Sequence, residues 1–311
     1  MQQLGNHDAP EDQRPVQLDH AGIVALVGRP NVGKSSLLNR LVGCPLSIVT
    51  PKVQTTRRRL AGIVERPAVQ WVLTDTPGLL PAATNALERQ MMRTAQAALA
   101  EGDLVLLVVE AGRWTTGDER AARLARAARK PLHVAVNKID RLADKRRLLP
   151  FIAAHIAPLQ AAAVYPVSAQ NGDGIAALEA GLSAALPPGP ALFPPGQIAD
   201  RNEQFIAAEA VREALMLRLH QEVPYRLTVT IERWRETPGL IHIDAAIFVA
   251  KESQKGIVIG RGGEVLKQVG SRARVKLEKL LGRQVMLRLW VRVRRDWIDD
   301  AKAVTELGAG D

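Results

Sequence analysis

The chain of 311 residues is 47% hydrophobic and 24% charged, a composition that suits a globular protein with two domains of ordinary size and excludes a disordered or fibrous one. Its single cysteine, Cys44, cannot form an internal disulfide, and no apolar run approaches the ~18 residues of a membrane span, so we expect a reducing, cytoplasmic setting. The net charge of +10 is concentrated in one segment, because Lys251 to Arg295 contains thirteen basic and three acidic residues and carries +10 by itself.

The chain begins with a polar, proline-containing stretch, residues 1–19. It has no basic start, apolar core or cleavage site, so we expect a disordered tail and not a signal peptide. In residues 20–186, short β-rich runs alternate with helical stretches rich in Ala and Leu. This alternation predicts an α/β domain with a mostly parallel sheet covered by helices on both faces, and an antiparallel hairpin at one edge. The predicted strands are Gly22–Gly28, Leu60–Glu65, Val69–Asp75, Asp103–Val109, Pro131–Asn137 and Ala163–Val167, and the predicted helices are Val32–Val42, Leu87–Ala100, Asp118–Ala128, Ala143–Ala154 and Ile175–Ala185.

A change of composition marks the end of this domain. Leu186 to Gly196 contains five prolines and two glycines, so residues 187–200 are predicted to be a linker. Residues 201–300 follow a different order, which predicts a smaller α+β domain, and residues 301–311 are expected to be a C-terminal tail. The predicted order is a helix at about Asn202–Gln221, strands at Tyr225–Arg235 and Leu240–Val249, a glycine turn, a helix at Glu264–Leu281 and a strand at Gln284–Arg294.

The segment Gly28 to Ser35, GRPNVGKS, fits the phosphate-loop motif G-x-x-x-x-G-K-S/T and lies between a predicted strand and a predicted helix. Its glycines let successive backbone N–H groups point toward phosphates, Lys34 can neutralise the β- and γ-phosphates, and the Ser35 hydroxyl can ligate Mg²⁺. An ordinary glycine-rich turn is the alternative for this motif taken alone. The predicted phosphate-binding residues are Gly28, Arg29, Pro30, Asn31, Val32, Gly33, Lys34, Ser35, Ser36 and Gly78.

A second motif, DTPG at Asp75 to Gly78, follows the second apolar strand after the phosphate loop. An aspartate at this place can hold the water shell of Mg²⁺, and the Gly78 N–H can contact the γ-phosphate. A plain turn is the alternative for these four residues in isolation. Their position directly after a strand favours a nucleotide site.

A third motif, NKID at Asn137 to Asp140, selects the base. The Asp140 carboxylate can accept hydrogen bonds from N1–H and the exocyclic amine of guanine, whereas adenine has an unprotonated N1 and no amine at that position, so we expect discrimination on the order of 10⁴ or more. Asn137 is expected to contact N7 and to brace the loop, and Lys138 to pack over the base. The residues SAQ follow the next strand, where the Ala169 N–H would point at guanine O6. The predicted guanine-binding residues are Asn137, Lys138, Asp140, Ser168, Ala169 and Gln170.

These segments together resemble the TrmE-Era branch of the translation-factor-related GTPases: GRPNVGKSSLLNRLVG, QTTR, DTPG, NKID and SAQ. The resemblance covers about Ala21 to Leu307, and the C-terminal domain narrows it to the bacterial ribosome-assembly members of that branch. It implies that Thr56 is a second protein ligand of Mg²⁺ beside Ser35 and, through water, Asp75. A β-rich loop without a ligand is the alternative for the adjacent threonines. The implied switch residues are Gln54, Thr55, Thr56, Asp75, Thr76, Pro77, Gly78 and Leu79.

The sequence indicates the nucleotide-binding residues more clearly than the residues that promote hydrolysis. Many GTPases orient the attacking water with a glutamine directly after DTPG, and here that place holds Leu79, which cannot hold a water. The resemblance implies a potassium ion beside the phosphates, which would compensate negative charge in the transition state as an arginine finger does. The implied ligands are Asn31 and switch-loop oxygens near Thr50, Lys52 and Thr55, although Asn31 could equally be a structural turn residue.

The second domain contains the sequence GIVIGRGGEVLKQVG, which is expected to begin as a strand and to turn at Gly260–Gly263 into a helix. A G-x-x-G turn at a helix start lets an RNA backbone approach closely. The order of elements and the basic segment favour a KH-type RNA-binding domain over a merely solvated basic face. The predicted RNA contacts are Gly260, Arg261, Gly262, Gly263, Lys267, Arg288, Arg292 and Arg294.

Apolar residues near this turn leave alternatives open. Ile257, Ile259 and Val265 suit either a base-binding groove or the core. Trp234 and Trp290 alternate with polar residues on predicted strands, and we expect them to pack rather than to stack on bases.

The resemblance implies a GTP-hydrolysing switch that binds the 3′ region of 16S ribosomal RNA and assists assembly of the 30S subunit. We expect a monomer that binds no DNA. Family members make a peripheral contact with the inner membrane, but nothing in this chain requires one. Two alternatives are an RNA-modification or translation GTPase, which would need a catalytic appendage, and a passive RNA-binding module in which bound GTP is structural.

Overall fold

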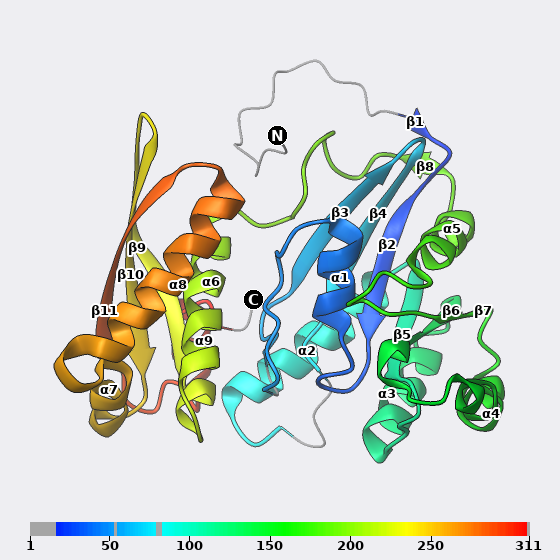
Figure 1. Cartoon of the computed structure of the whole chain (residues 1–311), viewed down its shortest axis with the longest axis horizontal. Helices are drawn as coiled ribbons and strands as arrows, with labels where there is room; N and C mark the ends of the chain where they lie inside the picture. The colour runs from blue at the N-terminus through cyan, green and yellow to red at the C-terminus, as the bar shows by residue number, and fades with distance from the viewer. Residues whose placement is uncertain (1–16, 53–54, 79–82, 310–311) are drawn as a thin grey trace. The chain divides into compact units, whose positions relative to one another are not determined.

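The computed structural model describes residues 17–52, 55–78 and 83–309 (Figure 1). These residues form two compact units. The first contains residues 17–47, 58–78 and 92–200, and the second contains residues 48–52, 55–57, 83–91 and 201–309. Across the described ranges, no helix combines the length and the apolar character that crossing a membrane requires.

A six-stranded sheet forms the centre of the first unit, with the order β3-β4-β2-β5-β6-β7. β3 is antiparallel to β4 at one edge and the other neighbouring pairs are parallel, which confirms the predicted fold class. The carboxyl ends of the parallel strands meet at one edge, and the loops that follow them carry the predicted nucleotide motifs. The strands are β2 (His20–Val27), β3 (Leu60–Arg66), β4 (Val69–Asp75), β5 (Leu104–Glu110), β6 (Leu132–Asn137) and β7 (Ala163–Pro166).

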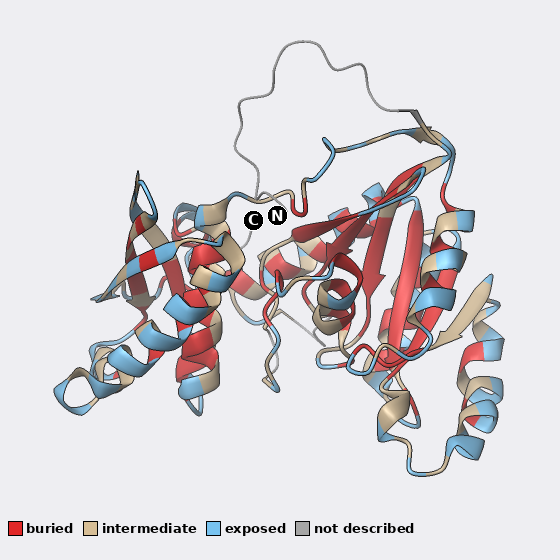
Figure 2. Cartoon of the chain, turned by 45° about the horizontal axis from the view of Figure 1, so that its top comes forward, coloured by how far each residue is buried: buried red, intermediate tan, exposed pale blue. Residues whose placement is uncertain are grey.

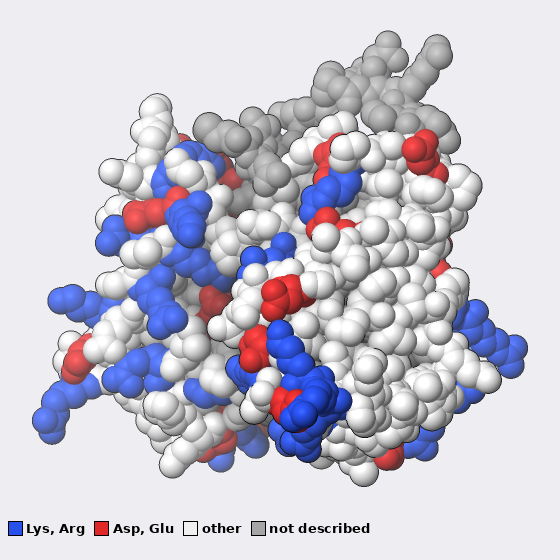
Figure 3. All heavy atoms as spheres, turned by 45° about the vertical axis from the view of Figure 1, so that its right-hand side comes forward, with Lys and Arg blue, Asp and Glu red and all other residues white. Residues whose placement is uncertain are grey.

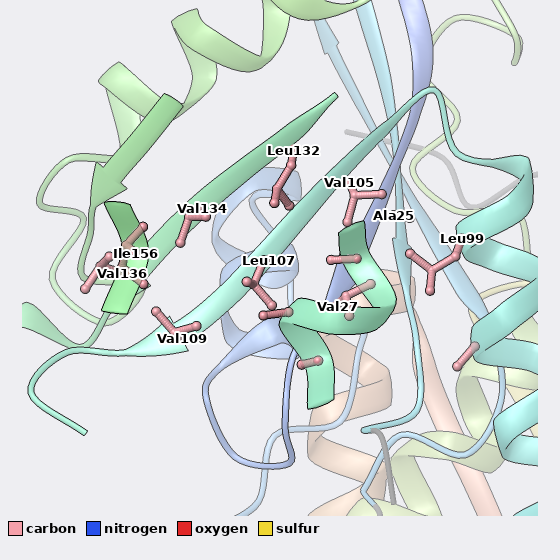
Figure 4. Packing of buried hydrophobic residues seen from close by; sticks show 14 of the residues in the cluster. Ala25, Val27, Leu99, Val105, Leu107, Val109, Leu132, Val134, Val136 and Ile156 are labelled. Atoms are coloured by element: carbon pink, nitrogen blue, oxygen red, sulfur yellow. The ribbon is translucent and has the colours of Figure 1, made fainter. Parts of the chain in front are cut away.

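Helices cover both faces of this sheet because its strands are apolar on both sides. On one face, α2 and α3 pack against alternate strand residues such as Val105, Leu107 and Val134 (Figure 4). On the other face, α1 contacts β3 and β4, and α5 contacts β2, β4 and β7. The helices are α1 (Lys34–Val42), α2 (Ala86–Glu101), α3 (Thr116–Ala127) and α5 (Ile175–Ala185).

The helix predicted at Ala143–Ala154 is shorter and irregular in the structure. α4 spans only Leu148–Phe151, preceded by a 3₁₀ turn and followed by a π-helical turn and a second 3₁₀ turn. Pro150 explains the late start, because proline lacks the N–H group that a helix interior needs and is tolerated only in the first turn. A regular helix therefore cannot begin at Ala143.

Parts of the predicted tail and linker lie against the sheet of the first unit. β1 (Gln17–Leu18) pairs with β8 (Gly189–Pro190) in antiparallel fashion. The buried side chain of Gln70 donates to the Phe193 carbonyl at 2.9 Å and accepts the N–H groups of Leu192 and Phe193 at 2.8 and 2.9 Å. Hydrogen bonds to a buried side chain thus hold the proline-rich segment on the first unit.

In the second unit, helices pack against one face of a three-stranded sheet of order β11-β10-β9 (Figures 1 and 2). β9 and β10 are antiparallel, and β10 and β11 are parallel. Buried side chains such as Val211, Ile247 and Val269 join the helices to the sheet. The elements are α6 (Glu203–Arg218), β9 (Leu227–Thr237), β10 (Leu240–Val249), α7 (Glu252–Ile259), α8 (Glu264–Leu281) and β11 (Gln284–Val293).

The residues before the glycine turn are helical, so the strand predicted there was wrong. They end α7, whose start is capped by Gln254: its side-chain oxygen accepts the N–H groups of Ala250 and Lys251 at 3.0 and 3.2 Å. Residues two positions apart in a helix point in nearly opposite directions, at about 100° per residue. Ile257, which is exposed, and Ile259 therefore lie on different sides of α7 and do not line one groove together.

Residues 301–306, predicted as part of the tail, form the short helix α9 (Ala301–Glu306). Trp297 is fully buried beside Val304, Leu307 and Met91 in a small hydrophobic cluster. Packing in this cluster stabilises the helix. Because the cluster joins residues that are distant in sequence, no local sequence pattern indicates a helix here.

Candidate functional site

The phosphate-loop residues connect β2 to α1 in a turn that requires glycine at two places. A Cβ on Gly28 would lie 2.4 Å from the Val108 carbonyl oxygen, and one on Gly33 would lie 2.3 Å from Asn137 Nδ2. Gly33 also has a φ of 101°, which glycine adopts without strain. Glycines thus allow the loop to approach the ends of β5 and β6.

Lys34 is buried at the first turn of α1. Its Nζ donates to the carbonyls of Gly28 at 3.0 Å and Arg29 at 3.2 Å, so the ammonium group lies within the loop. Burial lowers the pKa of Lys34 from 10.5 to about 8, while the nearby charge of Asp75 raises it. A phosphate in the loop would favour the charged form, so this lysine fits an anion site.

Hydroxyls from two segments meet the carboxylate at the end of β4. The Oγ atoms of Ser35 and Ser47 both donate to Asp75 Oδ2, at 2.6 and 2.7 Å. Mg²⁺ binds oxygen ligands and retains several waters, so this donor set together with nucleotide phosphates fits it. Ser47 lies outside every motif and was not predicted; Asn39 positions it through two hydrogen bonds of 2.8 Å to its N–H and carbonyl.

The remaining DTPG residues lie against the phosphate loop. Thr76 Oγ1 donates to the Leu26 carbonyl at 2.7 Å. A Cβ on Gly78 would lie 2.9 Å from Pro30 Cγ, so Gly78 is in close contact with the phosphate loop. The predicted switch residues Gln54 and Leu79 lie outside the described residues.

Asn137 joins three of the predicted nucleotide-binding segments. Its Nδ2 donates to the Val32 carbonyl at 2.9 Å, and its Oδ1 accepts the N–H groups of Lys138 at 2.8 Å and Ala169 at 3.0 Å. Ser168 Oγ donates to Asp140 Oδ1 at 2.6 Å. The structure therefore brings together the phosphate loop, NKID and SAQ.

A charged network lies behind these segments. Lys138 Nζ donates to the Asn31 carbonyl at 2.6 Å and lies 3.4 Å from Glu110. Glu110 also pairs with Arg29 at 2.7 Å, and Arg29 pairs with the buried Asp118 at 2.9 Å. Burial lowers the pKa of Lys138, and the attraction of Glu110 opposes that shift. The Arg29 side chain thus pairs with acidic residues of β5 and α3. Only the backbone of Arg29 is then expected to contact phosphates.

Three of the four predicted potassium ligands belong to one turn in the second unit. Thr50 Oγ1 and Thr55 Oγ1 are 2.8 Å apart, and Thr55 Oγ1 donates to the Lys52 carbonyl at 2.7 Å. Arg212 of α6 donates to the Thr55 carbonyl at 2.6 Å, and Lys52 Nζ donates to carbonyls at the end of α6. Arg212 could not be predicted, because the residue that it contacts is 157 positions away.

The predicted RNA-binding turn joins α7 to α8. Gly260, Gly262 and Gly263 all have positive φ, at 75°, 58° and 79°. A Cβ on Gly260 would lie 2.5 Å from Val265 Cγ2, whereas a Cβ on Gly262 or Gly263 would have no atom within 4 Å. Gly260 is therefore needed for packing, and the next two glycines leave an open surface beside the exposed Arg261.

The other predicted RNA contacts lie on two elements. Lys267 is exposed on α8, whereas Arg288 and Arg292 lie on the outer face of β11, away from the helices. Arg292 pairs with Glu232, and Arg294 pairs with Glu306, both at 2.6 Å. Lys and Arg side chains gather over the surface of the second unit (Figure 3).

Trp290 shares the outer face of β11 and is 42% exposed, so the expectation that it packs was wrong. β11 is an edge strand whose alternate residues face the helices, and Trp290 falls on the other set. Trp234 is half-buried, and its Nε1 donates to Glu236 at 2.9 Å.

Comparisons with known proteins match both units. Residues 23–138 match the family model described as 50S ribosome-binding GTPase, and residues 222–298 match the KH domain model. The chain is 48% identical to GTPase Era of Stenotrophomonas maltophilia (strain R551-3) over 289 residues, which is 93% of this chain and 97% of that protein. It is also 48% identical to GTPase Era of Xanthomonas oryzae pv. oryzae (strain MAFF 311018), over 93% of this chain and 96% of that one.

Two solved structures resemble the chain over nearly its full length. One is Era in complex with MgGDPNP and nucleotides 1506–1542 of 16S ribosomal RNA, with a TM-score of 0.89, 37% identity and coverage of 94% of this chain and 99% of that one. The other is a variant of Aquifex aeolicus Era bound to GDP.AlF4⁻, with a TM-score of 0.90, 37% identity and coverage of 94% and 100%.

Proposed function

The chain belongs to the Era family of GTPases, and from that premise we propose that it is a GTP-hydrolysing switch that binds the 3′ region of 16S ribosomal RNA and assists 30S assembly. The observation that carries the proposal is the presence, in one chain, of a complete set of nucleotide motifs and an exposed glycine turn in a KH unit. The two similar solved structures contain a GTP analogue with 16S RNA and GDP.AlF4⁻, respectively.

The phosphate end of the proposed site uses backbone N–H groups and four side chains. The N–H groups of residues 31–36 would surround the phosphates, with Lys34 compensating their charge from inside the loop. Ser35 and Thr56 would ligate Mg²⁺, and Asp75 would hold it through water. When bound, the metal compensates charge on the β- and γ-phosphates.

The base end of the proposed site selects guanine. Asp140 accepts from N1–H and the exocyclic amine, and Ser168 holds one of its oxygens in place through the 2.6 Å hydrogen bond. The apolar stem of Lys138 packs over the base while its ammonium is held by the Asn31 carbonyl and Glu110. Adenine would leave the Asp140 carboxylate without a hydrogen-bond donor. The cost of that unpaired carboxylate explains why the preference for guanine over adenine is expected to be large.

For hydrolysis, the proposal includes a potassium ion held by Asn31 and by oxygens of Thr50, Lys52 and Thr55. The hydrogen bonds that join Thr50, Lys52 and Thr55 in one turn support it. A monovalent cation there would compensate transition-state charge, in a site where Leu79 cannot hold the attacking water.

The RNA-binding part of the proposal places an RNA backbone over Arg261, Gly262 and Gly263, with Lys267 as a phosphate contact. The protein acts in the cytoplasm as a monomer without affinity for DNA, and any contact with the inner membrane is peripheral. The rival function is a passive RNA-binding module in which GTP is structural.

Two measurements test this function. RNA crosslinked to the protein in cells is sequenced, and the reads are expected to concentrate at the 3′ end of 16S RNA. Hydrolysis of GTP by the purified protein is expected to rise when an oligonucleotide of that sequence is added. Hydrolysis that is slow and unchanged by RNA would favour the passive module, and crosslinks to tRNA would favour a translation or RNA-modification GTPase.

A further inference from the structure

Arg40 links the two ends of the nucleotide site through a contact that no motif predicts. It lies in the last turn of α1, the helix that begins at Lys34. Its Nε donates to the Ala169 carbonyl at 2.9 Å, and its Nη2 donates to the Gln170 carbonyl. One guanidinium therefore bridges the helix that starts in the phosphate loop and the loop that follows β7.

The loop after β7 depends on such tethers because it has no regular secondary structure. Its first part is held by Asn137, which accepts the Ala169 N–H at 3.0 Å, and by Ser168, whose N–H donates to the Asp173 carbonyl at 2.9 Å. The carbonyls of Ala169 and Gln170 have no other hydrogen-bond donor among the described residues. Arg40 is therefore the one donor to these two carbonyls among the described residues, and the second peptide group is also held by the Asn171 N–H, which donates to Ser168 Oγ at 3.0 Å.

We propose that Arg40 is a positioning residue for guanine recognition, which holds the Ala169 carbonyl and thereby fixes the backbone directly after the Ala169 N–H, the group that Asn137 also holds and that is expected to meet guanine O6. The inference rests on the proposed nucleotide site. By directing two successive carbonyls toward α1, Arg40 restricts rotation of the peptide planes on either side of Gln170, the first of which begins at the Ala169 carbonyl. Because α1 also carries Lys34, the base and the phosphates are bound at a fixed separation.

The arrangement requires an arginine rather than any cation. A guanidinium presents several N–H donors in a rigid plane and can hold two carbonyls at once, whereas a lysine ammonium is a point charge on a flexible stem. Arg40→Lys should therefore restore only part of the function that Arg40→Ala removes.

The test uses the full chain and three nucleotides that differ in the base. GDP and IDP both present O6 and N1–H, whereas 2-aminopurine riboside diphosphate lacks both. In Arg40→Ala, the dissociation constants of GDP and IDP are expected to rise up to about tenfold, the upper end of what one neutral hydrogen bond, from the Ala169 N–H to O6, contributes. The constant for the 2-aminopurine nucleotide is expected to change by less than about twofold, and kcat at saturating GTP should be unchanged while KM rises.

A matched control is Arg126→Ala. Arg126 is an exposed arginine in the last turn of α3, and its side chain makes no hydrogen bond or ion pair among the described residues. This variant should bind all three nucleotides as the parent protein does.

The outcomes separate this inference from the site on which it rests. If the parent protein binds GDP and the 2-aminopurine nucleotide equally well, the proposed guanine site is wrong. If the parent protein discriminates but Arg40→Ala binds all three nucleotides normally, or loses the same factor for all three, Arg40 has no role in reading O6 and the inference fails.

Discussion

Burial and charge oppose each other at Lys34. Without nucleotide, burial lowers the pKa of this lysine to about 8, although Asp75 favours the charged form. Below about pH 8 the buried Lys34 carries its charge, and the cost of burying the ammonium lowers the free energy of unfolding. The unfolded chain binds more protons than the folded one between about pH 8 and 10.5, so Lys34 makes the folded protein gain stability as the pH rises through that window.

This shift predicts that GDP binding takes up protons at alkaline pH. Just above the Lys34 pKa of about 8, many molecules hold a neutral lysine, and the phosphates restore its charge. GDP affinity should therefore fall as the pH rises above about 8, and calorimetric heats should depend on the ionisation enthalpy of the buffer. Lys34→Arg, which is always charged, should lack this dependence. Heats of the parent protein that are equal in all buffers would contradict the assignment.

The base preference should be reversible at Asp140. In Asp140→Asn, the amide oxygen can keep the hydrogen bond from Ser168, which is 2.6 Å long in the structure, and the amide N–H can then pair with the extra oxo group of xanthine. We expect weaker GTP binding and a preference for xanthosine triphosphate in a competition assay. Asp144→Asn, at an exposed carboxylate of the same unit, should retain guanine preference. Retained guanine preference in Asp140→Asn would refute the role.

Single residues could be predicted from the sequence where their chemistry is local. Lys34, Asp75 and Asp140 lie in short motifs directly after strands, so spacing alone suggested their roles. Arg40 and Glu110 could not be found in this way, because Arg40 contacts a residue 129 positions away and Glu110 pairs with Arg29 over 81 positions. Such contacts depend on which strands become neighbours, which no local pattern encodes.

At the scale of elements, strands buried on both faces were easiest to predict because their apolar runs are short and end at turn residues. β4 and α5 have the predicted bounds. The helix α7 could not be predicted, because its β-branched residues favour a strand, while the Gln254 cap and the burial of Val258 favour a helix. Tertiary packing outweighed local propensity there.

The turn formed by Thr50, Lys52 and Thr55 leads to a prediction about cations. If its oxygens and Asn31 hold potassium, GTP hydrolysis should be faster in potassium than in sodium salts. Asn31→Asp is the better variant for the test than Asn31→Ala, because Asn31 has a φ of 64°, which aspartate tolerates better than alanine. It should change the potassium dependence more than the GDP affinity. Equal rates of the parent protein in the two salts would exclude the potassium role.

For the whole molecule, the division of charge matters most. The segment from Lys251 to Arg295 accounts for the entire net charge of +10, so the remainder of the chain is neutral in sum. The nucleotide site compensates phosphates with few cations, whereas the KH unit is strongly basic. The affinities for GDP and for RNA should therefore depend differently on salt concentration. RNA affinity should fall steeply with ionic strength, whereas GDP affinity should not.

Replacing Arg261 and Gly262 with aspartates should separate the activities of the two units. The structure tolerates the change, because a Cβ on Gly262 would meet no atom within 4 Å and aspartate is among the residues that accept its φ of 58°. Gly260, where a Cβ would lie 2.5 Å from Val265, is left intact. Two carboxylates would then face the RNA backbone, so RNA affinity should fall at least about tenfold, or about 1.4 kcal/mol, with a weaker salt dependence.

In the same double variant, intrinsic GTP hydrolysis should be unchanged, whereas stimulation by RNA should vanish. The matched control is Ala301→Asp with Lys302→Asp, which changes the net charge by the same amount at two exposed positions in the first turn of α9, where acidic residues favour the helix. It should retain most RNA affinity if the contact is local to the glycine turn. Equal losses in both variants, in filter-binding titrations of proteins with parental circular dichroism spectra, would show that RNA responds to the net charge and not to a contact at this turn.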